Sequence, residues 1–205
     1  MPNWCNNVIE LTHEDPAMIE RASKALVDGK FLEEFIPVPE SLHIVAGRVG
    51  DGDEQKKLEE DTARNLEVHG YGNWYDYCVN EWGTKWDVGG DGIEPSIDGK
   101  TLTASFDSAW SPPCAAYEKL VDLGFTIRAY YYEGGMCYAG IWEDGVDDYY
   151  DLSGMDSAQV KEQLPSELDE MFCISEYMAE WEEENAKKSK HREYPFDLSG
   201  YSPFG

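Results

Sequence analysis

The stretch from residue 98 to residue 131, DGKTLTASFDSAWSPPCAAYEKLVDLGFTIRAYY, decides the fold because its apolar side chains change period twice. Residues 101–107 carry apolar side chains at every second position, which is typical of a strand with one buried face. Ser111 and Pro112 begin a helix that ends at Gly124, and residues 125–131 alternate again. The stretch therefore predicts a strand, a helix and a second strand in succession.

The residues on the N-terminal side predict a second set of elements. Residues 4–12 alternate polar and apolar side chains and fit a strand. Asp15 followed by Pro16 is typical of a helix start, and Gly29 ends that helix. Residues 84–88 place apolar side chains on one side and predict another strand before the Asp-Gly turn that opens the quoted stretch.

The combined order is β-α, an insertion and β-β-α-β, followed by hairpin strands at 136–142 and 146–150. This is the split β-α-β order of ferredoxin-like folds, in which an antiparallel sheet carries its helices on one face. We therefore expect an α+β, ferredoxin-like protein with a helical insertion at about 31–83 and a C-terminal helical extension.

The insertion contains three kinds of segment. Residues 31–52 predict an irregular connection, and residues 53–67 predict a charged, mostly solvated helix. Asn73 is placed to cap a short helix. The apolar face of that helix would be formed by Trp74, Cys78 and Trp82.

The chain changes character near residue 152. We expect a ferredoxin-like domain at 1–152, a helical extension at 153–190 and a loosely ordered tail at 191–205. A capping-box pattern predicts one helix over 166–188, which either packs on its own domain or forms a homodimer. Its apolar stripe comprises Leu168, Met171, Phe172, Met178 and Trp181.

The charge restricts the partners. Sixteen basic and 42 acidic residues give a formal charge of −26 in 205 residues, which opposes direct binding to nucleic acid or to an anionic membrane. Half of that net charge lies in residues 133–205. The acidic surface either imitates the phosphates of DNA toward a basic host protein or serves solubility alone.

Sequence motifs for chemistry are few. The five cysteines are odd in number and without C-x-x-C spacing, which indicates reduced thiols. The histidines stand apart, and neither calcium-loop spacing nor a nucleotide-binding or nucleophile motif is present. We expect no cofactor, no metal, no membrane segment, and a soluble chain in the cytoplasm of a bacterial host cell.

Aromatic and acidic residues are dense in four segments, where they predict either a ligand groove or, for the tryptophans, the core. Trp86 shares this ambiguity with Trp74, Trp82 and Trp110. The candidate binding residues within these segments are Trp74, Asp76, Asp87, Asp107, Trp110 and Glu133. Candidate acids outside them are Asp147, Asp148, Glu176, Glu180 and Glu183.

The same segments carry a family resemblance. They read MPNWCNN at 1–7, NWYDYCVNEWGTKWD at 73–87, FDSAWSPP at 106–113 and YYEGGMCYAG at 131–140. In this order they resemble the YubB-type ferredoxin-like family, a domain of unknown function found on plasmids, prophages and phages. The resemblance covers about residues 1–151 and implies the ferredoxin-like fold and a mobile-element setting. It implies no reaction and no catalytic residues.

Two functional hypotheses follow. The first is a non-enzymatic, acidic interaction protein of a phage or mobile element that binds a host protein, such as a defence factor or a nucleic-acid-handling protein, through a DNA-mimic-like surface. The alternative is a small-ligand, carbohydrate or nucleotide-binding protein, or a hydrolase, that uses an aromatic and acidic cleft. The first predicts a partner whose binding weakens with salt, and the second predicts that the acids converge on an open cleft.

Overall fold

The computed structural model describes residues 3–192, with side chains as far as residue 188. The chain divides into two compact units, an N-terminal unit that ends at Asp151 and a C-terminal unit that begins at Leu152. Within the described residues the structure is α+β, as the hydrophobic periodicity predicts.

The N-terminal unit is built on a six-stranded antiparallel sheet with the strand order β2-β3-β1-β4-β5-β6. The central strand β1 (Trp4–Thr12) pairs with β3 (Thr101–Ala109) on one side and with β4 (Thr126–Glu133) on the other. The remaining strands are β2 (Ser96–Asp98), β5 (Tyr138–Glu143) and β6 (Val146–Asp151). The first four strands have the ferredoxin-like order, and the last two extend it as a hairpin.

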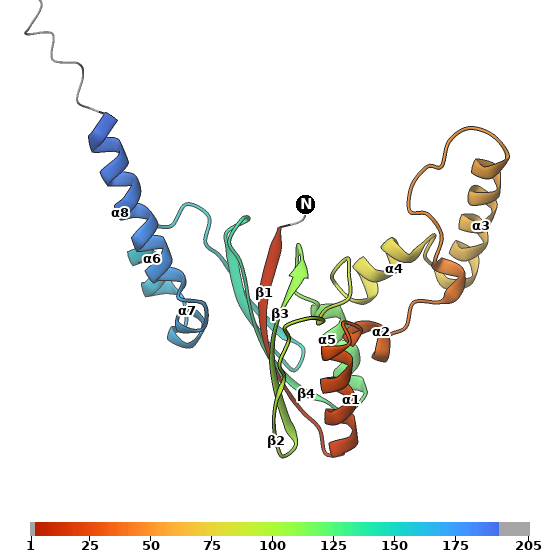
Figure 1. Ribbon diagram of the computed structural model, residues 1–205, viewed down its shortest axis with the longest axis horizontal. Coiled ribbons are helices and arrows are strands. Elements are labelled where there is room, and N and C mark those ends of the chain that lie inside the picture. Colours follow the sequence, from red (N-terminus) through yellow and green to blue (C-terminus); the bar gives the residue numbers. More distant parts are fainter. Residues whose placement is uncertain (1–2, 193–205) are drawn as a thin grey trace, which may run out of the picture. The chain divides into compact units, whose positions relative to one another are not determined.

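Helices α1 (Pro16–Val27) and α5 (Cys114–Asp122) cover one face of the sheet (Figure 1). Every second residue of β1 and β4 points into this layer, because a pleated strand alternates its side chains. Ile9, Leu11 and Ile127 are fully buried there. The core is therefore a two-layer contact between sheet and helices, as expected.

The prediction of a strand at 84–88 is wrong. The second strand of the fold is β2, which pairs with β3 across the turn at Gly99. Residues 84–88 form no strand because side-chain hydrogen bonds hold the segment to other parts of the chain. The Thr84 hydroxyl bonds to the backbone of Ala109, and the Asp87 carboxylate accepts bonds from the amides of Leu32 and Glu33. The alternation of Trp86 and Val88 imitates a strand without forming one.

The insertion is more helical than predicted. Residues expected to be irregular form α2 (Phe31–Phe35) and a short 3-10 turn, η1 (Glu40–Leu42). The solvated helix is confirmed as α3 (Asp53–His69) and ends at Gly70 in the left-handed conformation. The helix capped by Asn73 is confirmed as α4 (Trp74–Glu81), with Cys78 and the following Trp82 buried in the core.

The C-terminal unit contains α6 (Ser157–Gln163), α7 (Ser166–Phe172) and α8 (Ile174–Arg192). The prediction of one continuous helix over 166–188 is wrong, because Cys173 has a φ of 51° and ends α7. The Asp169 carboxylate then accepts bonds of 2.7 Å from the Ser175 amide and 2.6 Å from its hydroxyl, which favours a new helix start. The expected tail at 191–205 lies outside the described residues from 193 onward.

Candidate functional site

Aromatic side chains gather around one lysine at an exposed edge of the N-terminal unit. The Lys85 ammonium lies 4.7 Å from the ring centre of Trp86, 5.1 Å from that of Trp110 and 5.6 Å from that of Tyr75. The ring of Trp4 lies 5.9 Å from that of Trp86. We call these five residues the Lys85 patch. Its three indoles are exposed, by 50% in Trp4, 39% in Trp86 and 42% in Trp110.

The Lys85 ammonium is held by ring faces and not by a carboxylate. Among the residues that the structure describes, no acidic side chain lies within ion-pair distance of it, although the chain has 42 acids. A lysine ammonium over an aromatic face gains about 0.5–1 kcal/mol at an exposed site and more when desolvated. Lys85 is half-buried, so these ring contacts are its electrostatic support.

Side-chain bonds to the backbone place Lys85 and Trp86 beside Trp110. The Thr84 hydroxyl bonds to the carbonyl of Ala109 at 3.0 Å and to its amide at 3.1 Å. The Ser111 hydroxyl donates to the Gly83 carbonyl at 2.5 Å. Because Thr84 is fully buried, these bonds form away from water and fix the segment to the end of β3.

Glycine is required immediately before this segment. Gly83 has a φ of 83°, and a Cβ there would lie 3.2–3.3 Å from backbone atoms of Pro112, Cys114 and Ala115 at the start of α5. The close approach of two backbones, together with the left-handed conformation, excludes most side chains. The route of the chain into the Lys85 patch therefore depends on Gly83.

Trp110 is held in a conformation that few side chains adopt. Its φ is 70°, and both of its backbone groups are bonded: the amide donates to the Asn3 carbonyl at 2.9 Å, and its carbonyl accepts from the Tyr138 hydroxyl at 2.6 Å. A non-glycine residue with positive φ costs on the order of 1–3 kcal/mol and is concentrated at functional sites. Here the strain presents an indole to solvent and adds nothing to the core.

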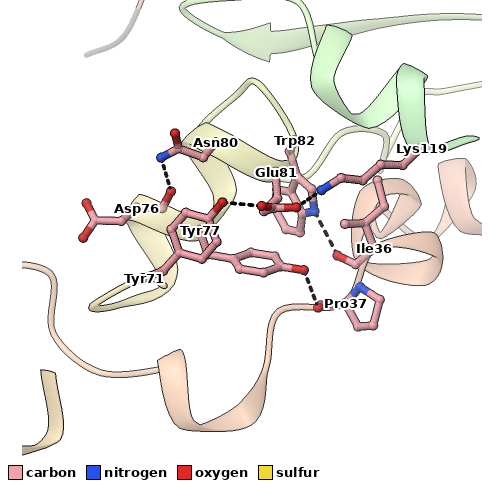
Figure 2. Close-up of polar contacts among 9 residues, drawn as sticks. All are labelled: Ile36, Pro37, Tyr71, Asp76, Tyr77, Asn80, Glu81, Trp82 and Lys119. Atoms are coloured by element: carbon pink, nitrogen blue, oxygen red, sulfur yellow. Dashed lines mark hydrogen bonds and ion pairs between the residues drawn. The ribbon is translucent and has the colours of Figure 1, made fainter. Parts of the chain in front are cut away.

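Tyr75 lies on α4. Side chains of α4 and of the following Trp82 anchor this helix to other segments (Figure 2). The Tyr77 hydroxyl donates to the Pro37 carbonyl at 3.1 Å, and the Trp82 indole donates to the Ile36 carbonyl at 2.9 Å. Glu81, at the end of α4, bonds to both Tyr71 and Lys119, as Figure 2 shows. The helix that carries Tyr75 is thus tied to residues 36–37, to Tyr71 and to Lys119 of α5.

Acidic side chains lie next to the patch in the chain. Asp107 is exposed and accepts a 2.7 Å bond from Asn6, which extends from the same face of β1 as Trp4. Asp76 follows Tyr75 and is half-buried, with its carboxylate bonded to Asn73 at 2.9 Å. The patch therefore combines exposed rings and a single ammonium, and carboxylates lie close to its residues in the chain.

Comparisons with known proteins give little beyond this geometry. No protein-family model matches the chain, and no curated protein matches it. The chain is similar to a solved structure, the crystal structure of protein api92 from Yersinia pseudotuberculosis, which carries the family designation DUF1281. The two chains share 14% identity with a TM-score of 0.41, over 76% of this chain and 99% of that one.

Two of the candidate acids from the sequence are bonded to backbone amides. Asp87 caps α2 through bonds of 2.6 Å from Leu32 and 2.9 Å from Glu33. Burial raises the pKa of the Asp87 carboxyl, and the amide bonds oppose that change. Glu133 is 2% exposed and accepts bonds from the two amides of its own turn, at 2.8 Å and 2.6 Å. Asp87 therefore holds the start of α2, and Glu133 holds its own turn.

The other candidates lie on several separate elements. Trp74 packs against the core and contacts Tyr75 edge-on at 6.0 Å. Asp147 accepts a 2.7 Å bond from the buried Tyr131, and Asp148 is exposed beside it on β6. The candidate acids on α8 are exposed, and they are Glu176, Glu180 and Glu183. Glu176 also lines a hollow of about 620 Å³ within the C-terminal unit.

Of the five residues of the Lys85 patch, only Trp110 is among the candidate binding residues predicted from the sequence. The other four, Trp4, Tyr75, Lys85 and Trp86, lie in the same aromatic segments but were not predicted to bind a ligand. A useful signal was present: Lys85 is a single basic residue between Trp82 and Trp86 in an acidic and aromatic segment. Within residues 3–192, no cluster of three or more potential ligands could hold a metal ion, and no helix there is long and apolar enough to cross a membrane.

Proposed function

We propose that this chain is a non-enzymatic, protein-binding module of a phage or other mobile element, and that the Lys85 patch is the centre of its binding surface. The partner would be a basic host protein in the bacterial cytoplasm. The observation that carries the proposal is the set of three exposed indoles, fixed in one patch at the cost of a left-handed Trp110. Tryptophan, tyrosine and arginine are the residues most enriched among binding hot spots.

The fixed geometry supports this proposal on energetic grounds. Ordering a side chain at an interface costs about 0.5–1.5 kcal/mol, and rings that are already held in place avoid much of that cost. The bonds of Thr84 and of the Trp110 backbone hold the rings of the patch in place in the unbound protein. Such preorganisation favours a surface that receives a partner.

The charge supports a basic partner. A net charge of −26 attracts cations over long distances and accelerates their association, with a strong dependence on salt. The exposed carboxylate of Asp107 lies on the strand that leads to Trp110. A host defence or nucleic-acid-handling protein has the required positive surface.

Membership in the YubB-type family belongs to the same proposal. It rests on the four motifs, three of which contribute residues to the Lys85 patch. The alternative, a ligand-binding protein or hydrolase, has less support because Asp87 and Glu133 accept bonds from backbone amides. The homodimer expected through the 166–188 segment stays a prediction, which light scattering of the full chain tests.

The experiment is affinity capture from lysate of the bacterial host with three full-length baits: wild type, Trp86→Ala and Trp181→Ala. Trp181 is a matched control because it is 69% exposed and lies on α8, in the C-terminal unit. We expect one basic protein to be enriched by wild type and by Trp181→Ala, and reduced about tenfold by Trp86→Ala. Raising the salt concentration should weaken capture.

The proposal fails if no captured protein depends on Trp86. It also fails if the Trp86-dependent partner is acidic, or if its binding ignores ionic strength.

A further inference from the structure

The Lys85 patch has the construction of a cation cage that is occupied by its own lysine. Aromatic cages bind ammonium groups by placing the cation within about 6 Å of several ring centres. The Lys85 ammonium meets this condition at three rings, of Tyr75, Trp86 and Trp110. The cage is therefore already shaped for a cationic head group.

The resident lysine is weakly held compared with the lysines that form ion pairs. Among the described residues it has neither a carboxylate partner nor a hydrogen-bond acceptor, so its three N–H donors depend on water. Lys119, by contrast, is bonded to Glu81. A lysine on a flexible four-carbon stem can leave the rings without breaking an ion pair.

The surroundings favour a cation over an anion as the external ligand. The chain carries a net charge of −26. Such an excess of negative charge repels an approaching anionic ligand and attracts a cationic one. Trp4 adds a ring face that contacts Trp86, so the aromatic surface is larger than Lys85 alone uses.

We propose that the Lys85 cage binds a cationic side chain of the partner protein, an arginine or a methylated lysine, and that Lys85 is the resident competitor which this side chain displaces. The inference rests on the proposed protein-binding function and names what the patch recognises. An external cation can bind only to molecules in which Lys85 has left the cage. Occupancy of the cage by Lys85 therefore raises the apparent dissociation constant of that cation. Removal of the Lys85 charge should therefore tighten the binding of cations.

The test titrates tetramethylammonium chloride into the full chain and follows the indole N–H signals of Trp86 and Trp110 by NMR, with sodium chloride at the same ionic strength as reference. Lys85→Met removes the ammonium and keeps an unbranched side chain. We expect it to bind tetramethylammonium about fivefold more tightly than wild type, as the loss of a competing cation–π contact predicts. Lys85→Gln serves as a second variant, with the same expected direction.

Two controls define the result. Lys57→Met, on the exposed surface of α3, causes the same change of net charge and should bind as wild type does. Adding Trp86→Leu to Lys85→Met should abolish binding, because the cage loses a wall. Benzoate is the opposing probe, and we expect no Lys85-dependent binding of it.

The inference is overturned if neither Lys85 variant tightens tetramethylammonium binding, or if benzoate binds and is weakened by Lys85→Met. Either result leaves the proposed function standing wherever capture of the partner still depends on Trp86. Loss of Trp86-dependent capture with an intact tetramethylammonium response would instead reject the protein-binding function and retain the cage.

Discussion

The protein exposes tryptophan in two places that differ in how the rings are held. In the Lys85 patch, Trp86 contacts a second indole and an ammonium, and the segment that carries it is bonded to β3. On α8, Tyr177 and Trp181 are one helical turn apart and are 65% and 69% exposed. Neither makes a ring contact with any residue that the structure describes.

This difference shows that exposure alone does not define a recognition surface. Exposed apolar side chains that stand singly are ordinary features of protein surfaces. The Lys85 patch differs because strain at Trp110 and a glycine-dependent backbone approach at Gly83 are maintained to present its rings.

The largest expected effect is on thiol reactivity. Burial raises the pKa of Cys5 and of Cys78 to about 12, whereas Cys173, at the joint between α7 and α8, is exposed. Since only the thiolate reacts, we expect the two buried thiols to be alkylated by iodoacetamide at pH 8 at least about a hundredfold more slowly than Cys173. Mass spectrometry of labelled peptides measures the rates.

The same pKa values give the sign of a pH dependence. The native thiols of Cys5 and Cys78 keep protons that the unfolded chain releases near its ordinary thiol pKa. The free energy of unfolding should therefore fall as pH rises above about 9, by at most about 1.4 kcal/mol per pH unit for each thiol. Rapid labelling of Cys5 or Cys78 in the native state, or constant stability at alkaline pH, would contradict the packing of this unit.

Gly83→Ala should destabilise the N-terminal unit by about 1–3 kcal/mol, through a strained φ and contact with the backbone of α5. Gly145→Ala is a matched control: it also has a positive φ, but open space surrounds its Cβ position. Denaturant unfolding of both variants measures the difference. Equal losses would show that the close approach at Gly83 has no energetic role.

Thr84→Val should cost about 1–2 kcal/mol, because it leaves the buried amide and carbonyl of Ala109 without the hydroxyl. Thr84→Ser keeps that hydroxyl and should retain the bonds. NMR of Thr84→Val should show shifts in the indole signals of Trp86 and Trp110 and none in that of Trp181. Unchanged indole signals of Trp86 and Trp110 would show that the Thr84 hydroxyl does not position these rings.

The smallest expected effects are those of the exposed indoles on stability. Trp86→Ala and Trp181→Ala should each change the free energy of unfolding by no more than about 1 kcal/mol. The two rings should still differ in motion, with a higher order parameter for the Trp86 indole N–H than for that of Trp181. A Trp86 indole as mobile as Trp181 would remove the distinction between the two regions.

The sequence predicted regular elements well wherever a single periodicity extended through the element. Alternation located β1, β3 and β4, and the i, i+4 spacing of Cys78 and Trp82 located the buried face of α4. Alternation gave a wrong prediction at residues 84–88. The path of that segment is set by long-range hydrogen bonds of the Thr84 and Asp87 side chains.

The candidate site could be predicted only in part, for a related reason. The segments around Trp4, Trp86 and Trp110 were identified by their composition. Whether each indole is buried or exposed depends on the positive φ of Trp110 and on the approach of Gly83 to α5, which are tertiary features without a local pattern. The break at Cys173 was missed because Asp169 caps the next helix across a turn that resembles continued helix.

The most direct test of the Lys85 patch as a recognition surface is isothermal titration calorimetry of the captured partner against wild type, Trp86→Ala and Trp181→Ala. We predict that Trp86→Ala raises the dissociation constant by at least about tenfold, while the dissociation constant of Trp181→Ala stays within about twofold of that of wild type. Equal affinities for all three proteins, or a larger loss in Trp181→Ala, would contradict the account.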